Sequence, residues 1–356
     1  MSDVNKKNLC GFSRNLGCAS KLRKSLLKGI INALPRSLDQ FKDKITCNYD
    51  SFDDAAVYRL DDKISVVFTI DFITPVTNDP KRYGQIAVAN ALSDIYAKGA
   101  SPCIGLNVLG FPGTEIDLST VEEVLSAAHY KAEEANMIIV GGHTINLSEF
   151  FYGLAVLGFA ANNEIILNSG ACRGDALILT KPLGTNVILT MANRAGLKIG
   201  PEIIEEVYNT MCQINKIACT LMKEVGVNAC TDISGYGFIG HLSQMLEASN
   251  KKAIIWSSQI PVIKKSLELI TMPYPACSAE VNKADYACNV EITKSIPTAL
   301  ADLMYDAHTS GGLLISLPKL KSDILLEKLH NNKILCASVV GEIVDPEEQN
   351  SLIVVQ

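Results

Sequence analysis

The sequence predicts a two-domain protein that mixes α-helices with β-strands, and three observations support this. The chain has 356 residues, more than the roughly 250–300 at which a single hydrophobic core stops growing. Hydrophobic residues make up 48% of it, enough for a sizeable core. Apolar strand-like runs alternate with segments of helical periodicity, and a break in composition at 168–174 (NSGACRG) separates two such series. We therefore place a domain boundary at about residue 170.

The first domain, expected over 20–170, follows a polar arm. Residues 1–19 show no clear period, so we expect a flexible arm. Ser20 to Leu34 has the spacing of an amphipathic helix, with Ser20 as candidate N-cap and Pro35 as the stop. The other elements predicted for this domain are a strand at 64–70, a helix over 83–100 closed by Gly99, a strand at 104–111, a helix at 121–136, and strands at 138–142 and 153–160.

The second domain, expected over 171–356, starts again with a strand. It has no low-complexity segment and no short repeat. Its predicted elements are a strand at 176–180, long helical patterns at about 202–225 and 238–248, an irregular stretch over 251–297, a short strand after Gly311–Gly312, a helix at about 319–331, and strands near 335–343 and 351–355.

Charge and composition exclude several classes of protein. With 32 basic and 38 acidic residues the formal net charge is −6, which is not that of a nucleic-acid-binding protein. No charge-free run of about 18 apolar residues occurs, so we expect no membrane span. The first residues, MSDVNKKNLCGFSRN, lack the apolar region of a secretory signal. The 11 cysteines form no CxxC pair, which favours a cytoplasmic protein with free thiols, most of them buried.

Several aspartates stand where apolar runs end or where a helix face collects polar groups. Their convergence would require a cation, and Mg²⁺ suits a few carboxylates together with phosphate oxygens. The alternative is a set of solvated loop aspartates, with Asp94 and Lys98 as a surface i,i+4 pair. The aspartates are Asp53 and Asp54 before a strand pair, Asp71 at the end of a strand, Asp94 four residues after Asn90, and Asp232 before two glycines.

Two glycine motifs form a second candidate feature. Gly141–Thr144 (GGHT) follows a predicted strand, and Thr309–Gly312 (TSGG) follows Asp306. Such turns let backbone N–H groups approach an anion, although His143 is equally well interpreted as structural. Neither motif is a P-loop. The histidines that fall on predicted helices are interpreted as ordinary: His129, His241 and His330.

One cysteine has a distinctive neighbour. Cys18 lies three residues before Lys21, where the arm meets the basic helix. A helix N-terminus and a nearby ammonium group both favour the thiolate. We therefore expect a low thiol pKa and a reactive, exposed Cys18. The alternative is an incidental exposed cysteine.

Together these residues resemble a known family. Seven motifs occur in an order that is similar to selenophosphate synthetase (selenide, water dikinase), whose superfamily also holds aminoimidazole ribonucleotide synthetase, thiamine-monophosphate kinase and a hydrogenase-maturation protein. The motifs are GC-x-x-K at 17–21, DDAAVY at 53–58, TIDF-x-x-P at 69–75, NALSDIYAKGA at 90–100, GGHT at 141–144, TD-x-x-GYG-x-x-GH at 231–241 and D-x-x-TSGG at 306–312.

The resemblance implies a reaction and a set of site residues. The reaction converts ATP, selenide and water to selenophosphate, AMP and orthophosphate. Cys18 would be the reactive cysteine and Lys21 the lysine that contacts the ATP phosphates. The implied Mg²⁺ ligands are Asp54, Asp94 and Asp232. The implied ATP contacts are Lys21, Ser51, Phe52, Asp53, Asp71 and Asp94, with Gly142, His143 and Thr144 reaching ATP from the neighbouring protomer.

The resemblance also implies an α+β fold in a homodimer. The N-terminal domain would contribute strands to an intersubunit β-barrel, and the C-terminal domain would be an α+β sandwich. K⁺ is implied as an additional ion, and a selenium-delivery protein is a candidate partner. The alternatives are a superfamily member with another acceptor and a non-catalytic ATP-binding regulator. The chain departs from the family at Ser20, often a cysteine, and at Ala307-His308, usually Pro-Gln.

Overall fold

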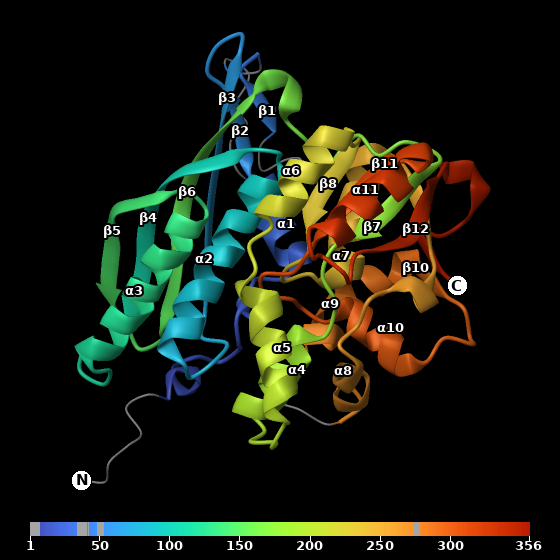
Figure 1. The fold of residues 1–356 in the computed structure, drawn as a ribbon. Coiled ribbons are helices and arrows are strands. Elements are labelled where there is room, and N and C mark those ends of the chain that lie inside the picture. The colour runs from blue at the N-terminus through green and yellow to red at the C-terminus, as the bar shows by residue number, and fades with distance from the viewer. Residues whose placement is uncertain (1–7, 34–40, 42, 48–52, 273–277) are drawn as a thin grey trace.

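Two β-sheets organise the molecule (Figure 1). The computed structural model describes residues 8–33, 41, 43–47, 53–272 and 278–356. The first sheet uses residues between Ile45 and Ala161, and the second uses residues between Asp175 and Val355. The predicted domain boundary at about 170 lies between them and stays a prediction. No described helix combines the length and the apolar character needed to cross a membrane.

The first sheet has six strands in the order β1-β2-β3-β6-β4-β5. All neighbours are antiparallel except β4 and β5, which run parallel. Among the described residues β1 and β5 are the two edges, so the sheet stays open within one chain. Its strands are β1 (Ile45–Cys47), β2 (Ala56–Arg59), β3 (Ile64–Ile73), β4 (Ser101–Phe111), β5 (Ile138–Asn146) and β6 (Phe151–Ala161).

Helices cover one face of this sheet. Helix α2 (Pro80–Ala97) packs on β3 and β6, and α3 (Leu118–Glu134) packs on α2 (Figure 1). The Asp79 side chain caps α2 by accepting hydrogen bonds from the N–H groups of Lys81 and Arg82. Helix α2 is buried along most of its length, because it also contacts β8 and α5 of the second half of the chain.

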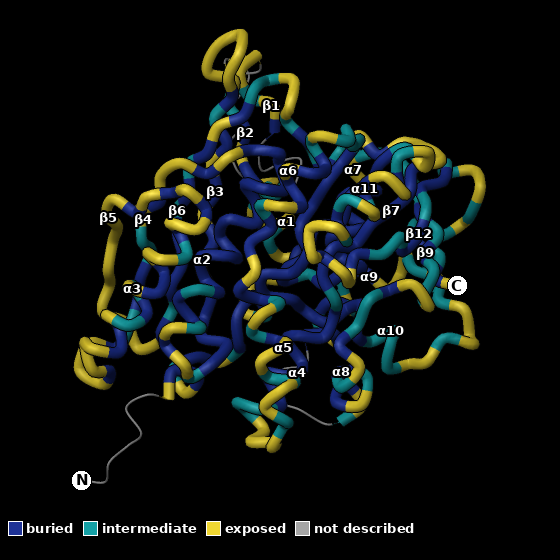
Figure 2. The backbone as a smooth tube through the Cα atoms, in the orientation of Figure 1, coloured by how far each residue is buried: buried dark blue, intermediate teal, exposed yellow. Residues whose placement is uncertain are grey.

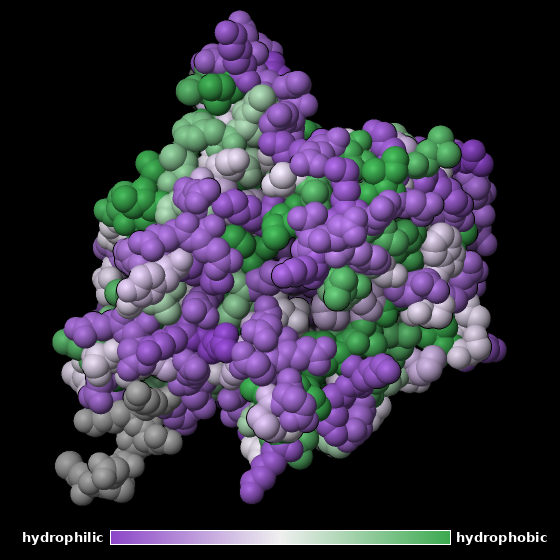
Figure 3. All heavy atoms as spheres, viewed as in Figure 1, coloured by the Kyte–Doolittle hydropathy of each residue, from purple (hydrophilic) through white to green (hydrophobic). Residues whose placement is uncertain are grey.

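The opposite face of the six-stranded sheet is apolar and uncovered. Side chains of β3 alternate between buried and exposed, as expected when successive residues point to opposite faces. The register aligns Phe68 with Leu157, Ile104 and Ile138 across four strands. Exposed β5 runs along the left of the molecule in Figure 2, and apolar residues gather over the same region in Figure 3. The large exposed apolar side chains on these strands are Ile64, Phe68, Ile70, Phe72, Ile104, Leu106, Ile138, Val140, Ile145 and Phe159.

The second sheet has seven strands in the order β10-β13-β9-β12-β7-β11-β8. It is antiparallel from β9 to β8 and parallel where β13 joins β9 and β10. Its strands are β7 (Asp175–Leu179), β8 (Ala229–Asp232), β9 (Lys252–Ile255), β10 (Val290–Ile292), β11 (Leu313–Pro318), β12 (Ser338–Val344) and β13 (Ile353–Val355). Its helices are α4 (Thr185–Asn193), α5 (Pro201–Cys212), α6 (Lys216–Val225), α7 (Gly237–Ser249), α8 (Lys264–Leu269), α9 (Ser278–Tyr286), α10 (Thr298–Tyr305) and α11 (Lys319–Asn331).

Several predicted boundaries are wrong. The helical pattern at 202–225 is two helices, because the chain leaves helical geometry at Gln213 and α6 restarts at Lys216. Asp71 lies inside β3, which continues to Ile73, and GGHT lies within β5 and not in a turn after it. The stop expected at Pro35 lies outside the described residues.

The N-terminal segment packs against the body of the protein. Helix α1 (Lys24–Asn32) begins after Arg23 and not after Ser20, which belongs to a 3₁₀ turn formed by Cys18–Ser20. Leu9, Cys10 and Leu16 are buried. These residues of the arm thus belong to the core, whereas the flexibility of the arm stays a prediction.

Candidate active site

Cys18 lies in a turn that is buried between the two halves of the chain. Its backbone N–H donates to Thr309 Oγ1 at 2.9 Å, and its Sγ lies 3.2 Å from Asn90 Oδ1. The preceding Gly17 has φ +56°, and a Cβ there would overlap the Thr309 side chain. Glycine is therefore required at position 17 for conformation and for space. The turn brings the cysteine against both α2 and the TSGG loop.

The thiol of Cys18 is protonated in this environment. Burial raises its pKa to about 12, and the positive charge of Lys21 only partly opposes that effect. The side chain is 1% exposed. The expected low pKa and the expected exposure are thus both wrong in this conformation, because desolvation outweighs the attraction of one ammonium group.

Lys21 forms an ion pair that also involves α2. Its Nζ lies 3.0 Å from Asp71 Oδ2, and the same oxygen accepts a 2.9 Å hydrogen bond from Asn90 Nδ2. Asn90 therefore links Asp71 to Cys18. Burial is the largest single effect and lowers the pKa of Lys21, but the surrounding acidic groups, Asp71 foremost, together outweigh it, so the net pKa lies well above the ordinary value. About a third of the Lys21 side chain remains exposed, so a ligand can reach its ammonium group.

Two predicted carboxylates and a histidine come together beside this pair, and the charge of one of these carboxylates acts on Asp94. Ligand atoms of Asp54, Asp232 and His241 lie within 4.8 Å of one another. Burial, and after it the charges of Asp232 and Asp71, raise the pKa of Asp94 well above its usual range. Burial and the charge of Asp54 raise that of Asp232 to about 7. Carboxylates that repel each other in this way suit a divalent cation with oxygen ligands.

Lys98 is a buried cation, whereas the alternative interpretation of the aspartates placed it on the surface. It forms ion pairs with Asp53 and, at 3.0 Å, with Asp54 Oδ2. Asn168 Oδ1 accepts a further hydrogen bond from its ammonium group at 2.6 Å. The alternative of a surface pair with Asp94 is therefore wrong, because Lys98 follows the last turn of α2 and points inward to the segment that precedes β2.

The TSGG loop is held from several sides. Ser310 N–H donates to Asn90 Oδ1 at 2.9 Å. Before the loop, buried Asp306 accepts hydrogen bonds from Ser278 and Asn186. His308 accepts a 2.9 Å hydrogen bond from Gly184 N–H through Nε2. The residues that depart from the usual Pro-Gln are thus accommodated inside the core.

Comparison with known proteins is consistent with this arrangement. Residues 52–160 match the family model described as AIR synthase related protein, N-terminal domain, and residues 173–353 match its C-terminal counterpart. A protein named selenide, water dikinase from Caldanaerobacter subterraneus is 39% identical over 345 residues, covering 97% of this chain and 98% of its own. Selenide, water dikinase 2 of Peptoclostridium acidaminophilum is 36% identical over 95% of each chain.

The chain belongs to the selenide, water dikinase family.

Solved structures of low sequence identity share its fold. Thiamine monophosphate kinase from Aquifex aeolicus superposes with a TM-score of 0.63 at 16% identity, covering 93% of each chain. The hydrogenase maturation protein HypE in complex with ATP superposes with a TM-score of 0.64 at 18% identity, covering 94% of this chain and 92% of its own. The α+β architecture inferred from the resemblance is therefore confirmed.

Some predicted site residues lie elsewhere or outside the described residues. Ser51 and Phe52 lie outside them. Gly142–Thr144 occupy an exposed edge strand. The register aligns Gly142 with Asp71 through two intervening strands, a separation of three strand spacings or about 14 Å. This segment therefore does not join the site of its own chain.

Two residues of the site were missed by the sequence analysis. His241 was interpreted as ordinary because it falls on a helix, yet it lies beside Asp54 and Asp232. Its place at the end of the GYG-x-x-GH motif was the available signal. Burial lowers its pKa to about 3, so the imidazole is neutral. Lys98 was missed because its partners are more than 40 residues away in the sequence.

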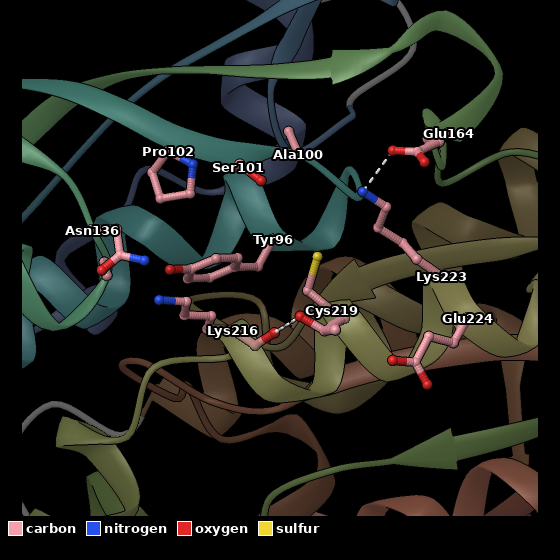
Figure 4. A pocket seen from close by; sticks show the side chains of 12 residues that line it. Tyr96, Ala100, Ser101, Pro102, Asn136, Glu164, Lys216, Cys219, Lys223 and Glu224 are labelled. Carbon is pink, nitrogen blue, oxygen red and sulfur yellow. Dashed lines mark hydrogen bonds and ion pairs between the residues drawn. The ribbon is translucent and has the colours of Figure 1, made fainter.

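A separate cavity of about 530 Å³ opens between the end of α2, the start of β4 and α6 (Figure 4). Tyr96, Lys216 and Cys219 contribute to its wall, and Lys223 pairs with Glu164 at 2.7 Å across one side. None of the residues predicted for the site from sequence lines it. The cavity therefore has no part in the proposed chemistry.

Proposed function

We propose that this chain catalyses the selenide, water dikinase reaction, which converts ATP, selenide and water to selenophosphate, AMP and orthophosphate. The observation that carries the proposal is the placement of Cys18 and Lys21 in one short segment, held against Asp71 and Asn90 beside the carboxylate cluster. An accessible ammonium group next to a cation site supplies the charge stabilisation that phosphoryl transfer requires, and a thiol is a soft group suited to a soft acceptor.

Asp54, Asp94 and Asp232 would hold Mg²⁺. The raised pKa values of Asp94 and Asp232 support this assignment, because a cation would relieve the repulsion that causes part of them. When bound, Mg²⁺ supplies charge neutralisation for the phosphate oxygens of ATP. His241 is neutral and buried, so it would orient the cluster without adding charge. K⁺ would be an additional bound ion, as the family resemblance implies.

Lys21 would bind the phosphate chain directly. Its ammonium is charged at neutral pH and partly exposed, and Asp71 fixes its direction. In the proposed mechanism the ammonium stabilises the charge that develops on the transferred phosphoryl group. Asn90 holds the Lys21 partner and the Cys18 thiol in one hydrogen-bonded set.

Cys18 would contact the selenide without forming a covalent bond to it and would present it to the phosphoryl group. Because the thiol is buried in this conformation, the 3₁₀ turn must move before selenide can reach it. We infer that the arm opens to accept selenide, from solution or from a delivery protein, and closes over the nucleotide to exclude water. The described cysteines are all free, which supports a reducing, cytoplasmic setting.

We infer further that a second copy of the chain covers the apolar face of the six-stranded sheet. Ten large apolar side chains on one sheet face suit burial in a dimer and not exposure to water. The register places His143 in line with Phe72, through Gly153 and Val108, and so on this same face. This supports a role of Gly142–Thr144 at the partner's nucleotide and an intersubunit barrel.

Product analysis tests the reaction. Wild-type protein incubated with ATP should form AMP only when selenide is present, and Cys18→Ser should lose this activity. Cys219→Ser, a buried cysteine on α6 away from the cluster, is the matched control and should retain it. ADP as the sole product, independent of selenide, would contradict the dikinase assignment. Full activity of Cys18→Ser would remove the role of Cys18.

Metal binding has its own test. Mg²⁺ should raise the melting temperature of the wild-type protein, and Asp232→Asn should weaken this shift because one ligand becomes neutral. Asp323→Asn, an exposed aspartate on α11, is the control. An Mg²⁺ response that is equal in all three proteins would rule out this cluster as the binding site.

The homodimer is tested by sedimentation. Phe68→Glu and Ile70→Glu place a charge in the apolar face and should shift the protein to monomers. Leu320→Glu changes a residue that is 94% exposed on α11 and should leave the mass unchanged. A wild-type monomer at micromolar concentration would exclude the proposed dimer.

A further inference from the structure

Lys181 is a buried lysine that the proposed chemistry leaves unused. It lies two residues beyond β7 and is 3% exposed. Its ammonium donates to two backbone carbonyls, that of Gln213 at 2.6 Å and that of Ser310 at 2.9 Å. No carboxylate among the described residues forms an ion pair with it. Burial lowers its pKa to about 7, so keeping this side chain here costs free energy that a neutral residue would not.

The Ser310 carbonyl belongs to the loop that receives Cys18. Thr309 Oγ1 accepts from Cys18 N–H, and Ser310 N–H donates to the same Asn90 oxygen that lies near Cys18 Sγ. On its other side Gly311 O accepts from Asn215 Nδ2 at 3.0 Å. One short loop therefore joins the cysteine turn, α2 and the connection between α5 and α6.

The loop has a conformation that needs support. Ser310 has φ +54°, a left-handed value that a residue with a side chain adopts only at a cost in free energy. Gly312 lies so close to the Lys181 backbone that a Cβ would overlap it. The Lys181 backbone thus packs against Gly312, and its ammonium binds the carbonyl of Ser310, the residue with the unfavourable φ.

We propose that Lys181 is a positioning residue, whose ammonium fixes the Ser310 peptide so that Thr309 and Asn90 hold Cys18 in its buried turn. The residue touches no reacting atom. It acts through Ser310, whose carbonyl accepts from the Lys181 ammonium and whose N–H donates to Asn90. Asn90 in turn lies against the Cys18 thiol. The effect on catalysis rests on the proposed function, whereas the effect on the position of Cys18 does not.

The test is the rate at which iodoacetamide alkylates Cys18 in the full chain, followed on its peptide by mass spectrometry. In Lys181→Met this rate should rise at least tenfold, because the loop no longer holds the turn. The alkylation rate of Cys230, which is fully buried on the edge strand β8 of the seven-stranded sheet, should not change. Lys321→Met is the matched control, since its ammonium also donates to a backbone carbonyl, that of Gly226, but away from the loop.

Kinetics supply a second measurement. The kcat for selenide-dependent AMP formation should fall at least tenfold in Lys181→Met, because the turn no longer closes firmly over the nucleotide to exclude water, while the KM for ATP should stay within twofold of wild type. If Lys181→Met fails to fold, Lys181→Gln keeps a neutral donor at the position and should give an intermediate alkylation rate. An unchanged rate of Cys18 alkylation would overturn the proposal. An equal rise in the alkylation rate of Cys230 would also overturn it, because it would indicate that the whole protein has loosened. If the wild-type protein forms no AMP but Cys18 is alkylated faster in Lys181→Met, only the proposed function is overturned.

Discussion

Two lysines of the site pair with aspartates, and they do so in opposite environments. Lys21 meets Asp71 at the surface end of the cluster, where about a third of its side chain is exposed. Lys98 meets Asp53 and Asp54 with no exposure of its own side chain. The first ammonium can exchange its partner for a phosphate, whereas the second is enclosed by groups that it must keep neutralised. The difference separates a lysine suited to binding from one suited to holding a carboxylate pair in place.

The largest effect tests the enclosed lysine. Lys98→Met leaves two buried carboxylates without their cation, so we expect the free energy of unfolding to fall by about 3–5 kcal/mol. Urea unfolding followed by circular dichroism measures it. Lys319→Met, which removes an exposed surface pair with Glu342, should cost less than about 1 kcal/mol. Equal losses in both variants would erase the contrast.

The accessible lysine should behave in the reverse way. Lys21→Met should lower kcat for AMP formation by about 10²–10³, the usual effect of removing one charge-stabilising group. Its unfolding free energy should change by only about 1 kcal/mol, because the pair is partly solvated and Asn90 still donates to Asp71. A stability loss as large as that of Lys98→Met would show that Lys21 is mainly structural.

A buried group without a charged partner extends the comparison. Burial lowers the pKa of His308 to about 4, against an ordinary value of 6.5. Between these values the unfolded chain takes up a proton that the folded chain refuses, so stability falls as the pH drops from about 6.5 to 4, by up to about 3 kcal/mol. His308→Gln keeps an acceptor for Gly184 N–H and should flatten this part of the pH profile. An unchanged profile would mean that His308 titrates normally.

The smallest effect concerns the residue beside Lys21. The Ser20 hydroxyl lies 2.8 Å from Thr74 Oγ1 and donates to Asn15 O at 3.1 Å. Ser20→Ala should lower the free energy of unfolding by about 1 kcal/mol and leave kcat within twofold. Thermal unfolding and AMP formation measure the two. A tenfold loss of activity would make Ser20 part of the catalytic segment.

The sequence predicted those parts of the fold that depend on local pattern. The spacing in 121–136 and 319–331 predicted helices α3 and α11 within a few residues, and the positive φ of Gly99 agrees with its predicted place after α2. The pattern at 202–225 predicted one helix, although the chain forms two. The interruption depends on contacts that are distant in the sequence, since Asn215 donates hydrogen bonds to Ser93 and to the Gly311 carbonyl.

Prediction of the site was limited for the same reason. Motif order predicted Cys18, Lys21 and the aspartates as site residues, since each occupies a recognisable local pattern, and their roles stay a prediction. The protonation state of Cys18 could not be predicted, because it depends on burial by α2 and the TSGG loop, segments 70 to 290 residues away. The i,i+4 spacing of Asp94 and Lys98 suggests a surface pair only where a helix face is free. Helix α2 is enclosed, so the spacing is not informative there.

The buried turn of Cys18 also determines how the protein meets oxidants. Peroxide attacks thiolates that it can reach, and a protonated thiol that is 1% exposed offers neither charge nor access. Among the described cysteines, Cys103, Cys172, Cys288 and Cys336 are exposed and would be oxidised first. The resting protein can thus lose surface thiols to oxidation while Cys18, the thiol that we propose for the selenium chemistry, remains reduced.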